Sequence, residues 1–335
     1  MLQPPSPSPA LFFETVNAYQ RTAAIRAALE LDCFTAINAG SDTPGALAKR
    51  CGADERGMRI LCDYLAVIGF LVKEAGRYRL TPDTAVFLDR ASPAYMGGTL
   101  EFLLAPSHVQ AFDDLAQAVR KGGTIMPEGG AVAPDHPMWT RFARAMVPMM
   151  ALPAQLVAER FIEAERPLKV LDIAAGHGLF GIAAAQRNPN ARIVAVDWPN
   201  VLQVAREHAQ RAGVAKRYET IEGSAFDVGY GEGYDAVLLT NFMHHFDVTT
   251  NEALLRKVRK ALAPGGKAVA LEFVPDEDRV TPPVAASFSL MMLGTTPKGD
   301  AYTYSEFERM FRNAGFTETA LHGLEPTMQQ VIVAR

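Results

Sequence analysis

A glycine-rich stretch in the second half of the chain has residues that could hold a nucleotide-like ligand. It reads Asp172-Ile-Ala-Ala-Gly-His-Gly-Leu-Phe-Gly, and its glycines, Gly176, Gly178 and Gly181, have the spacing G-x-G-x-x-G. This spacing is typical of a loop that leads from a strand into a helix and brings the backbone close to a nucleotide. A carboxylate at Asp172 would repel the pyrophosphate of NAD and attract an ammonium or sulfonium group. We therefore expect S-adenosylmethionine (SAM) at this loop rather than NAD.

A second acid, Asp197 in Val-Ala-Val-Asp-Trp-Pro, ends the next apolar run. A carboxylate at that position suits ribose hydroxyls, a feature that NAD sites and SAM sites share. The loop belongs to a C-terminal unit that follows a helical region and closes with a hairpin, and this placement favours SAM. An NAD-dependent oxidoreductase stays an alternative, which separate titrations with S-adenosylhomocysteine (SAH) and NAD would test.

Two adjacent histidines, His244 and His245, follow the apolar run Tyr-Asp-Ala-Val-Leu-Leu-Thr. They would lie at the carboxyl ends of the strands, where open α/β sheets bind their ligands. An imidazole with a pKa near 6.5 can take a proton from a phenol at neutral pH. Glu272, at the end of another apolar run, could orient the imidazole as the acid of a catalytic triad does. The alternatives are loop histidines that cap the next helix and an ordinary acid at a sheet edge.

Strands and helices that alternate from residue 168 onward would position these side chains. The strand candidates are 168–175, 191–197, 217–223, 234–240 and 266–273. This alternation predicts an α/β fold with a Rossmann-like, doubly wound parallel sheet. The last two segments, 316–324 and 328–335, are joined by a short Glu-Pro turn and predict a terminal hairpin that adds one antiparallel strand to the sheet.

The segment 11–100 is mainly helical and predicts a winged helix. Thr43 and Pro44 suit the N-cap and first position of a helix, and 71–80 predicts a hairpin around Ala75-Gly76. The helix over 56–70 would share one apolar face among Ile60, Leu61, Tyr64, Leu65 and Ile68. Acidic and basic residues nearly balance between 41 and 90, whereas a helix that reads DNA carries a basic excess. We expect a dimerisation domain rather than a nucleic-acid reader.

Residues 101–165 continue as helices and could line an acceptor pocket. The helix predicted over 138–157 has a stripe of large apolar side chains, and 287–299 adds two methionines. The pocket candidates are Trp139, Phe142, Met146, Met149, Met150, Met291 and Met292. Methionine adapts its shape to flat apolar ligands, but such a stripe also serves core packing, so both alternatives stay open.

The bulk composition limits the possible classes of protein. The 335 residues, 49% of them hydrophobic, suggest about two domains with cores of their own. A net charge of −4 predicts no general attraction to nucleic acid or acidic membranes. The three cysteines form no C-x-x-C pair, so we expect a reduced, cytoplasmic setting and no metal site. No apolar run approaches the roughly 18 residues that cross a bilayer, and the Pro/Ser-rich residues 1–10 predict a disordered tail.

Taken in order, the motifs resemble those of the plant-type, two-domain small-molecule O-methyltransferases. LDIAAGHG resembles that family's glycine motif, VAVDWPNVL its ribose-binding segment, EGSAF its Gly-Asp-Met-Phe, LLTNFMHHFD its catalytic histidine segment and YTYSEFERMFRNAGF its final motif. The resemblance covers nearly the whole chain beyond the tail. It implies a homodimer formed through the N-terminal winged-helix domain, and a Rossmann-like domain that uses SAM without a metal and releases SAH.

The resemblance also implies roles for single residues. His244 falls on the catalytic base, His245 replaces the family's aspartate beside it, and Glu272 falls on the first supporting glutamate. The second glutamate falls on Ala301, beside which Asp300 could substitute as a catalytic acid. The cofactor residues implied are Asp172, Gly176, Gly178, Asp197, Trp198, Gly223, Ser224, Ala225, Phe226 and Asn241.

Two departures from the family pattern concern the cofactor. Ala174 replaces the first glycine of the glycine motif, a small change that leaves room for the ligand. Ser224 and Ala225 replace the Asp-Met pair expected beside adenine, and a serine accepts from the adenine amino group more weakly than a carboxylate. We therefore expect SAM to bind with altered adenine contacts.

The expected function is methyl transfer from SAM to a hydroxyl of an aromatic small molecule, with His244 as general base and His245 in the acceptor pocket. The expected division is a winged-helix domain at 11–100, a helical linker at 101–165 and a methyltransferase domain at 166–335. Because the second glutamate is absent, C- or N-methylation that works mainly by proximity is an alternative. A winged-helix regulator that senses a ligand is another alternative.

Overall fold

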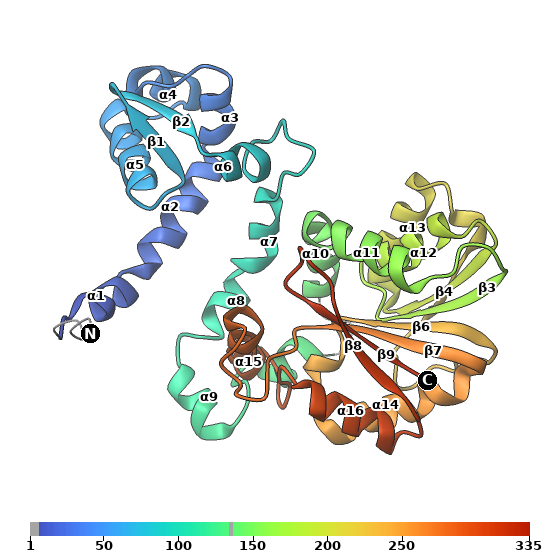
Figure 1. Ribbon diagram of the computed structural model, residues 1–335. Coiled ribbons are helices and arrows are strands. Elements are labelled where there is room, and N and C mark those ends of the chain that lie inside the picture. Colours follow the sequence, from blue (N-terminus) through green and yellow to red (C-terminus); the bar gives the residue numbers. More distant parts are fainter. Residues whose placement is uncertain (1–6, 134–136) are drawn as a thin grey trace, which may run out of the picture. The chain divides into compact units, whose positions relative to one another are not determined.

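The structure is a computed structural model that describes residues 7–133 and 137–335 and divides into two compact units, 1–100 and 101–335 (Figure 1). Most of the predicted tail at 1–10 lies outside the described residues. Residues 101–165, predicted as a linker, belong to the same compact unit as the sheet. The predicted fold class is confirmed, with a mainly helical N-terminal unit followed by a mixed α/β unit.

The first unit is a bundle of short helices with one hairpin. Its elements are α1 (Ala10–Val16), α2 (Ala18–Glu30), α3 (Cys33–Asn38), α4 (Pro44–Cys51), α5 (Glu55–Val67), β1 (Leu71–Glu74), β2 (Arg77–Leu80), α6 (Pro82–Phe87) and the 3-10 turn η1 (Gly97–Thr99). The Thr43 hydroxyl caps α4 by accepting from the N–H of Ala46 at 3.4 Å, as predicted. Ala75 and Gly76 form the hairpin turn with φ of 47° and 76°.

The apolar face predicted for α5 is wrong at one position. Met58, Cys62 and Leu65 are buried at i, i+4 and i+7, and they pack on α2 and α3. Ile60 is 43% exposed. At 100° per residue it lies 200° around the helix from Met58, and so on the opposite side. Sequence alone overestimated how much of this helix is covered within its own unit.

The second unit contains a seven-stranded sheet with the order β5-β4-β3-β6-β7-β9-β8 (Figure 1). The strands are β3 (Leu168–Ile173), β4 (Ala191–Asp197), β5 (Tyr218–Glu222), β6 (Tyr234–Thr240), β7 (Leu262–Glu272), β8 (Thr319–Gly323) and β9 (Gln330–Ala334). Only the pairings of β9 are antiparallel. The terminal hairpin therefore adds one antiparallel strand to the sheet, as predicted.

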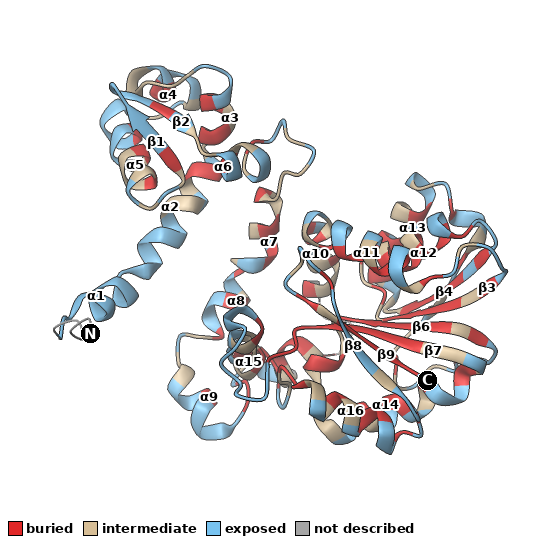
Figure 2. Cartoon of the chain, viewed as in Figure 1, coloured by how far each residue is buried: buried red, intermediate tan, exposed pale blue. Residues whose placement is uncertain are grey.

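Helices cover both faces of this sheet, which is the doubly wound arrangement predicted. The helices on one face are α11 (Val147–Phe161), α12 (Leu179–Arg187) and α13 (Pro199–Arg211), and those on the other are α14 (Val248–Ala261) and α16 (Tyr304–Asn313). The unit also contains α10 (Pro137–Ala145), which packs on α13, and α15 (Pro283–Thr295). Shorter elements are α7 (Leu100–Leu103), α8 (Pro106–Gln110), α9 (Leu115–Lys121) and the 3-10 turns η2 (Pro127–Val132), η3 (Ala215–Arg217) and η4 (Met243–His245). β3 and β6, near the middle of the sheet, are buried along nearly their whole length (Figure 2).

Alternation along the strands separates two cores. In β3, Val170 faces the cluster formed with α11, α12 and α13, whereas Leu171 faces the cluster formed with α14 and α16. β6 alternates in the same way. Such burial on both faces explains why these strands are nearly continuous apolar runs.

The single helix predicted over 138–157 is two helices. α10 ends at Ala145 and α11 begins at Val147, with Met146 between them at φ −92° and ψ 0°. Pro148 follows at the second position of α11 and has no N–H to continue the hydrogen bonds of α10. The break redirects the apolar stripe, so that Met146 and Met150 are buried while Trp139 and Phe142 are half-buried beside them.

Candidate active site

The glycine loop connects β3 to α12 and requires glycine for two different reasons. Gly176 and Gly178 have φ of +56° and +76°, where residues with a Cβ are strained. A Cβ on Gly181 would lie 2.7 Å from Cγ2 of Ile193, so this glycine lets α12 approach β4. Ala174 also has a left-handed φ, of +54°. The sequence predicted only that alanine leaves room there; the structure adds a backbone strain that glycine would avoid.

Asp172 is fully buried beneath this loop. Its Oδ2 accepts from the N–H of Gly181 at 2.9 Å, and its Oδ1 has no hydrogen-bond partner within residues 7–133 and 137–335. Burial raises the pKa of Asp172 to about 7; the Gly181 N–H opposes this increase and Asp197 adds to it. A positively charged ligand group at the loop would stabilise the ionised carboxylate.

Asp197 ends β4 next to the loop. Its Oδ2 accepts from the N–H of Gly176 at 2.8 Å and its Oδ1 from the N–H of Trp198 at 2.7 Å. Burial raises the pKa of Asp197 to about 6 in spite of these two donors. Each carboxylate oxygen keeps a second lone pair that a ribose hydroxyl can use. The left-handed glycines, the unpartnered oxygen of Asp172 and these lone pairs fit SAM.

The segment after β5, predicted to meet adenine, is anchored by backbone contacts. Gly223 donates its N–H to the carbonyl of Asp197 at 2.9 Å, and Ser224 Oγ accepts from the N–H of Phe226 at 3.1 Å. Lys257 Nζ donates to the carbonyls of Ala225 and Phe226 at 2.9 and 2.8 Å. The serine hydroxyl is thus partly used in its own turn, and Lys257 is a support that sequence reasoning missed.

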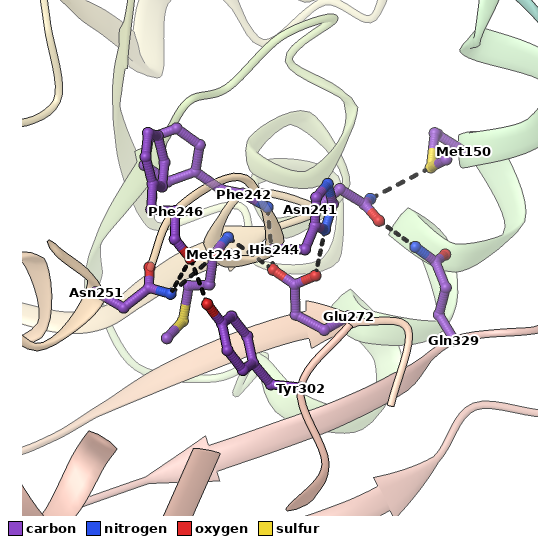
Figure 3. Close-up of polar contacts among 10 residues, drawn as sticks. All are labelled: Met150, Asn241, Phe242, Met243, His244, Phe246, Asn251, Glu272, Tyr302 and Gln329. Carbon is purple, nitrogen blue, oxygen red and sulfur yellow. Dashed lines mark hydrogen bonds and ion pairs between the residues drawn. The ribbon is translucent and has the colours of Figure 1, made fainter. Parts of the chain in front are cut away.

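Asn241 follows β6 in the left-handed region, with φ +54°, and its side chain connects two distant segments (Figure 3). Its Nδ2 donates to Sδ of Met150 at 3.5 Å, and its Oδ1 accepts from the amide of Gln329 in the terminal hairpin. The structure therefore joins a predicted cofactor residue to a predicted pocket residue. Gln329 was missed because no local pattern marks it.

His244 lies in η4, directly after β6, and is buried against Glu272 (Figure 3). The distance from Nδ1 of His244 to Oε2 of Glu272 is 2.5 Å. Oε1 of Glu272 accepts from the N–H groups of Phe242 and Met243 at 3.1 and 2.8 Å. A carboxylate can only accept, so Nδ1 carries the proton and Nε2 is the nitrogen with a free lone pair. The predicted base and orienting acid are in contact.

Three further groups hold the turn that carries His244. Asn251 Nδ2 donates to the carbonyls of Met243 and Phe246 at 2.9 and 3.2 Å. The Tyr302 hydroxyl also donates to the carbonyl of Phe246, at 2.6 Å (Figure 3). The backbone N–H of Asp300 donates to the carbonyl of His244 at 3.0 Å. Asn251 and Tyr302 are more than 50 residues apart, and sequence reasoning found neither.

The carboxylate of Asp300 does not do what the sequence suggested. Its Oδ2 pairs with Nη1 of Arg279 at 3.3 Å, at the surface. Ala301, at the position of the family's second glutamate, is fully buried. Asp300 therefore meets His244 through its backbone, not through its acid.

Aromatic rings extend from His244 toward the glycine loop. The His245 ring lies 4.3 Å from that of His244 and 5.2 Å from that of Trp139, and Phe142 lies 5.8 Å beyond Trp139. Phe142 stacks at 6.0 Å on His177 of the glycine loop. Burial lowers the pKa of His245 well below 6.5, and His244 lowers it further, so this ring is neutral.

Helix α15 places an aromatic ring against His244. Phe288 meets the His244 ring edge-on at 4.8 Å and stacks on Phe273. Met292 is buried and Met291 half-buried in the same helix. Phe288 was not among the predicted pocket residues, although it lies three residues before Met291 and so near it on the helix surface.

Two other kinds of feature are absent from residues 7–133 and 137–335. No group of three or more His, Cys, Asp or Glu side chains there could hold a metal ion. No helix there is long and apolar enough to cross a membrane.

A glycine loop, an acid at the end of the neighbouring strand and a His-Glu pair at the carboxyl edge of a doubly wound sheet are the parts of a Rossmann-like, SAM-dependent methyltransferase. Residues 112–317 match the family model of the O-methyltransferase domain, and residues 13–90 match that of the O-methyltransferase dimerisation domain. Since the first match spans more than half of the chain, this protein belongs to the O-methyltransferase family.

Known proteins resemble the chain over nearly its full length. A crystal structure of a Nostoc punctiforme protein assigned as an O-methyltransferase is 59% identical, has a TM-score of 0.95 and covers 98% of this chain and 99% of that one. The 3-hydroxy-5-methyl-1-naphthoate 3-O-methyltransferase of Streptomyces sahachiroi is 29% identical over 92% of this chain and 90% of its own length. Human N-acetylserotonin methyltransferase in complex with SAM has the same fold, with a TM-score of 0.83 at 22% identity and 99% coverage of both chains.

Proposed function

We propose that this SAM-dependent O-methyltransferase acts on a hydroxyl of an aromatic small molecule and that His244 is its general base. The observation that carries the proposal is the 2.5 Å contact between Nδ1 of His244 and Oε2 of Glu272. That contact leaves Nε2 as the proton-accepting atom. Asp172, Gly176, Gly178, Asp197 and Asn241 lie at the carboxyl ends of β3, β4 and β6, where SAM would be held.

The side chains around His244 perform the proton transfer. Nε2 takes the proton of the acceptor hydroxyl, and the Glu272 carboxylate stabilises the imidazolium that forms. SAM, when bound, supplies an electrophilic methyl group on a positively charged sulfur. Burial of His244 excludes water, and a positioned base typically contributes about 10²- to 10⁴-fold to the rate. The Asp300 N–H donates to the carbonyl of His244 and so helps to hold the backbone at this residue.

An aromatic acceptor suits the rings that surround the base. Trp139, Phe142, His245 and Phe288 offer flat apolar surfaces, and His245 adds a neutral imidazole rather than a charge. The relative from Streptomyces is named for a hydroxynaphthoate, a fused aromatic acceptor. Met146, Met149, Met150, Met291 and Met292 would complete an adaptable apolar lining.

One observation favours a second candidate function. Ala301 replaces the family's second glutamate, and the Asp300 carboxylate pairs with Arg279 instead of His244. A site with only one supporting acid would be adequate for C- or N-methylation, where the nucleophile needs little deprotonation.

The assembly and the compartment are part of the same proposal. The dimerisation-domain match supports a homodimer, formed through residues 13–90. The thiols of Cys33, Cys51 and Cys62 are free, which supports a reducing compartment such as the cytoplasm.

The test uses methyl-labelled SAM and a panel of hydroxylated aromatic compounds, with wild type and His244→Ala in parallel. Mass spectrometry and NMR of the products show whether the label is on oxygen, carbon or nitrogen. The proposal expects a labelled phenol ether whose formation falls at least about 10²-fold in the variant. A label on carbon or nitrogen that survives the variant would favour the second candidate instead.

A further inference from the structure

Two buried polar atoms without a partner lie beneath the glycine loop. They are Oδ1 of Asp172 and the hydroxyl oxygen of Tyr218, and neither has a hydrogen-bond partner in the described part of the chain. Native proteins leave few buried polar groups unpaired, so two beneath one loop indicate a shared task. Tyr218 starts β5, on the far side of β4 from Asp172.

The glycine positions show how near these two side chains are. A Cβ built on Gly181 would lie 2.9 Å from Oδ2 of Asp172 and 3.4 Å from Cε2 of Tyr218. A Cβ built on Gly178 would lie 2.7 Å from the hydroxyl of Tyr218. The carboxylate and the phenol therefore share the space under the first turn of α12.

The strand register explains why the tyrosine reaches this far. Ala195 of β4 pairs with Asp172, and Ile193 pairs with Tyr218. Val170, Ile193, Ala195 and Tyr218 all belong to one apolar cluster, so their side chains are on the same face of the sheet. Because Ala195 is small, the Tyr218 side chain can extend over β4 toward β3.

We propose that the Tyr218 hydroxyl donates to a water molecule that in turn donates a hydrogen bond to Oδ1 of Asp172, and that this link positions the carboxylate for the positively charged part of SAM. The proposal rests on the proposed use of SAM. A phenol can donate and a carboxylate can only accept, so the pair is complementary when Asp172 is ionised. Tyr218 is thus a positioning residue of the cofactor site.

The other groups near Asp172 cannot replace this donor. β6 contributes Leu238, and α12 contributes the Gly181 N–H, which already serves Oδ2. Asp197 on β4 is a like charge that favours protonation of Asp172. Arg206 on α13 donates to Thr220 and Glu222 instead.

The experiment measures SAH binding by isothermal titration calorimetry between about pH 5.5 and 9 for wild type and Tyr218→Phe. Loss of a hydrogen bond to an ionised group should raise the midpoint of the pH dependence by about one unit. Below both midpoints SAH would bind roughly tenfold more weakly to the variant, and above both the affinities would converge. The phenylalanine keeps the ring, and the thermal midpoint reports whether the fold is kept.

Two controls separate positioning from packing. Tyr234→Phe removes a buried tyrosine hydroxyl that donates to the carbonyl of Tyr230 at 2.6 Å, and it should leave the pH midpoint of SAH binding unchanged. In an Asp172→Asn background, Tyr218→Phe should add no further shift. An unmoved midpoint in Tyr218→Phe, or a shift that persists without the Asp172 carboxylate, would overturn this proposal alone. Absence of SAH binding by the wild type at every pH would overturn the proposed function as well.

Discussion

Replacing Glu272 with glutamine should stop His244 from acting as a base, while a side chain of nearly the same shape stays at position 272. In the native site one oxygen accepts from the N–H groups of Phe242 and Met243, and the other accepts from Nδ1 of His244 (Figure 3). The two backbone donors would hold the amide oxygen of the glutamine. Its NH₂ would then face His244 and donate to Nδ1, which forces the ring proton onto Nε2. The nitrogen that should accept the hydroxyl proton would be blocked.

The expected loss follows from this change of tautomer. A general base contributes about 10²- to 10⁴-fold, and the same kind of acid-to-amide change in a Ser-His-Asp triad costs about 10⁴-fold. We expect kcat of Glu272→Gln to fall by about 10³-fold, with the affinity for SAH unchanged.

Single-turnover methyl transfer at saturating SAM measures this loss, and SAH titration shows that the site is still formed. Glu277→Gln is a matched control, because Glu277 lies on the surface and binds Ser305. A rate for Glu272→Gln close to that of the wild type would refute the tautomer argument, whatever the control does.

Further predictions concern the supports of the site. Ala174→Gly should relieve the left-handed strain and stabilise the protein by about 1 kcal/mol, seen as a higher urea midpoint; a lower midpoint would show that the strain is absent. Asn251→Ala should lower kcat by about tenfold or more with little change in KM, and Tyr302→Phe should do less because Phe246 keeps its bond from Asn251; equal KM and kcat effects would contradict this. Folding raises the pKa of Asp172 from 3.8 to about 7, so stability is lost as pH rises through 7. Asp172→Asn should therefore raise the thermal midpoint of the ligand-free protein by several degrees at pH 8 and less at pH 5, and weaken SAH binding; a lower midpoint at pH 8 would refute this sign.

Much of the fold was predictable because local patterns specify it. β4 and β6 are apolar runs bounded by polar residues, and the structure gives them the limits predicted. α5 was harder: the single face predicted from the pattern included Ile60, whereas tertiary contacts bury Met58 and leave Ile60 exposed. The break at Met146 was not predicted, although Pro148 lies just after it. Proline is tolerated in the first turn of a helix, so Pro148 marks the start of α11.

The site was predictable where a motif carries it and not where the fold brings it together. His244 and Glu272 were found through strand ends and the family resemblance, and the structure places them in contact. Asn251, Tyr302 and Gln329 reach the site from a helix, a loop and the terminal hairpin. Such contacts depend on how separate elements pack, which no single stretch of sequence displays.

The most direct test of the account compares two acceptors in His244→Ala. One is a phenol identified with labelled SAM, and the other is an analogue acidified by ring substituents so that it is already ionised at the assay pH. If His244 acts as a base, the variant should lose at least about 10²-fold on the ordinary phenol and less than about tenfold on the ionised one. An equal loss on both acceptors would contradict proton removal by His244 and leave it a positioning role alone.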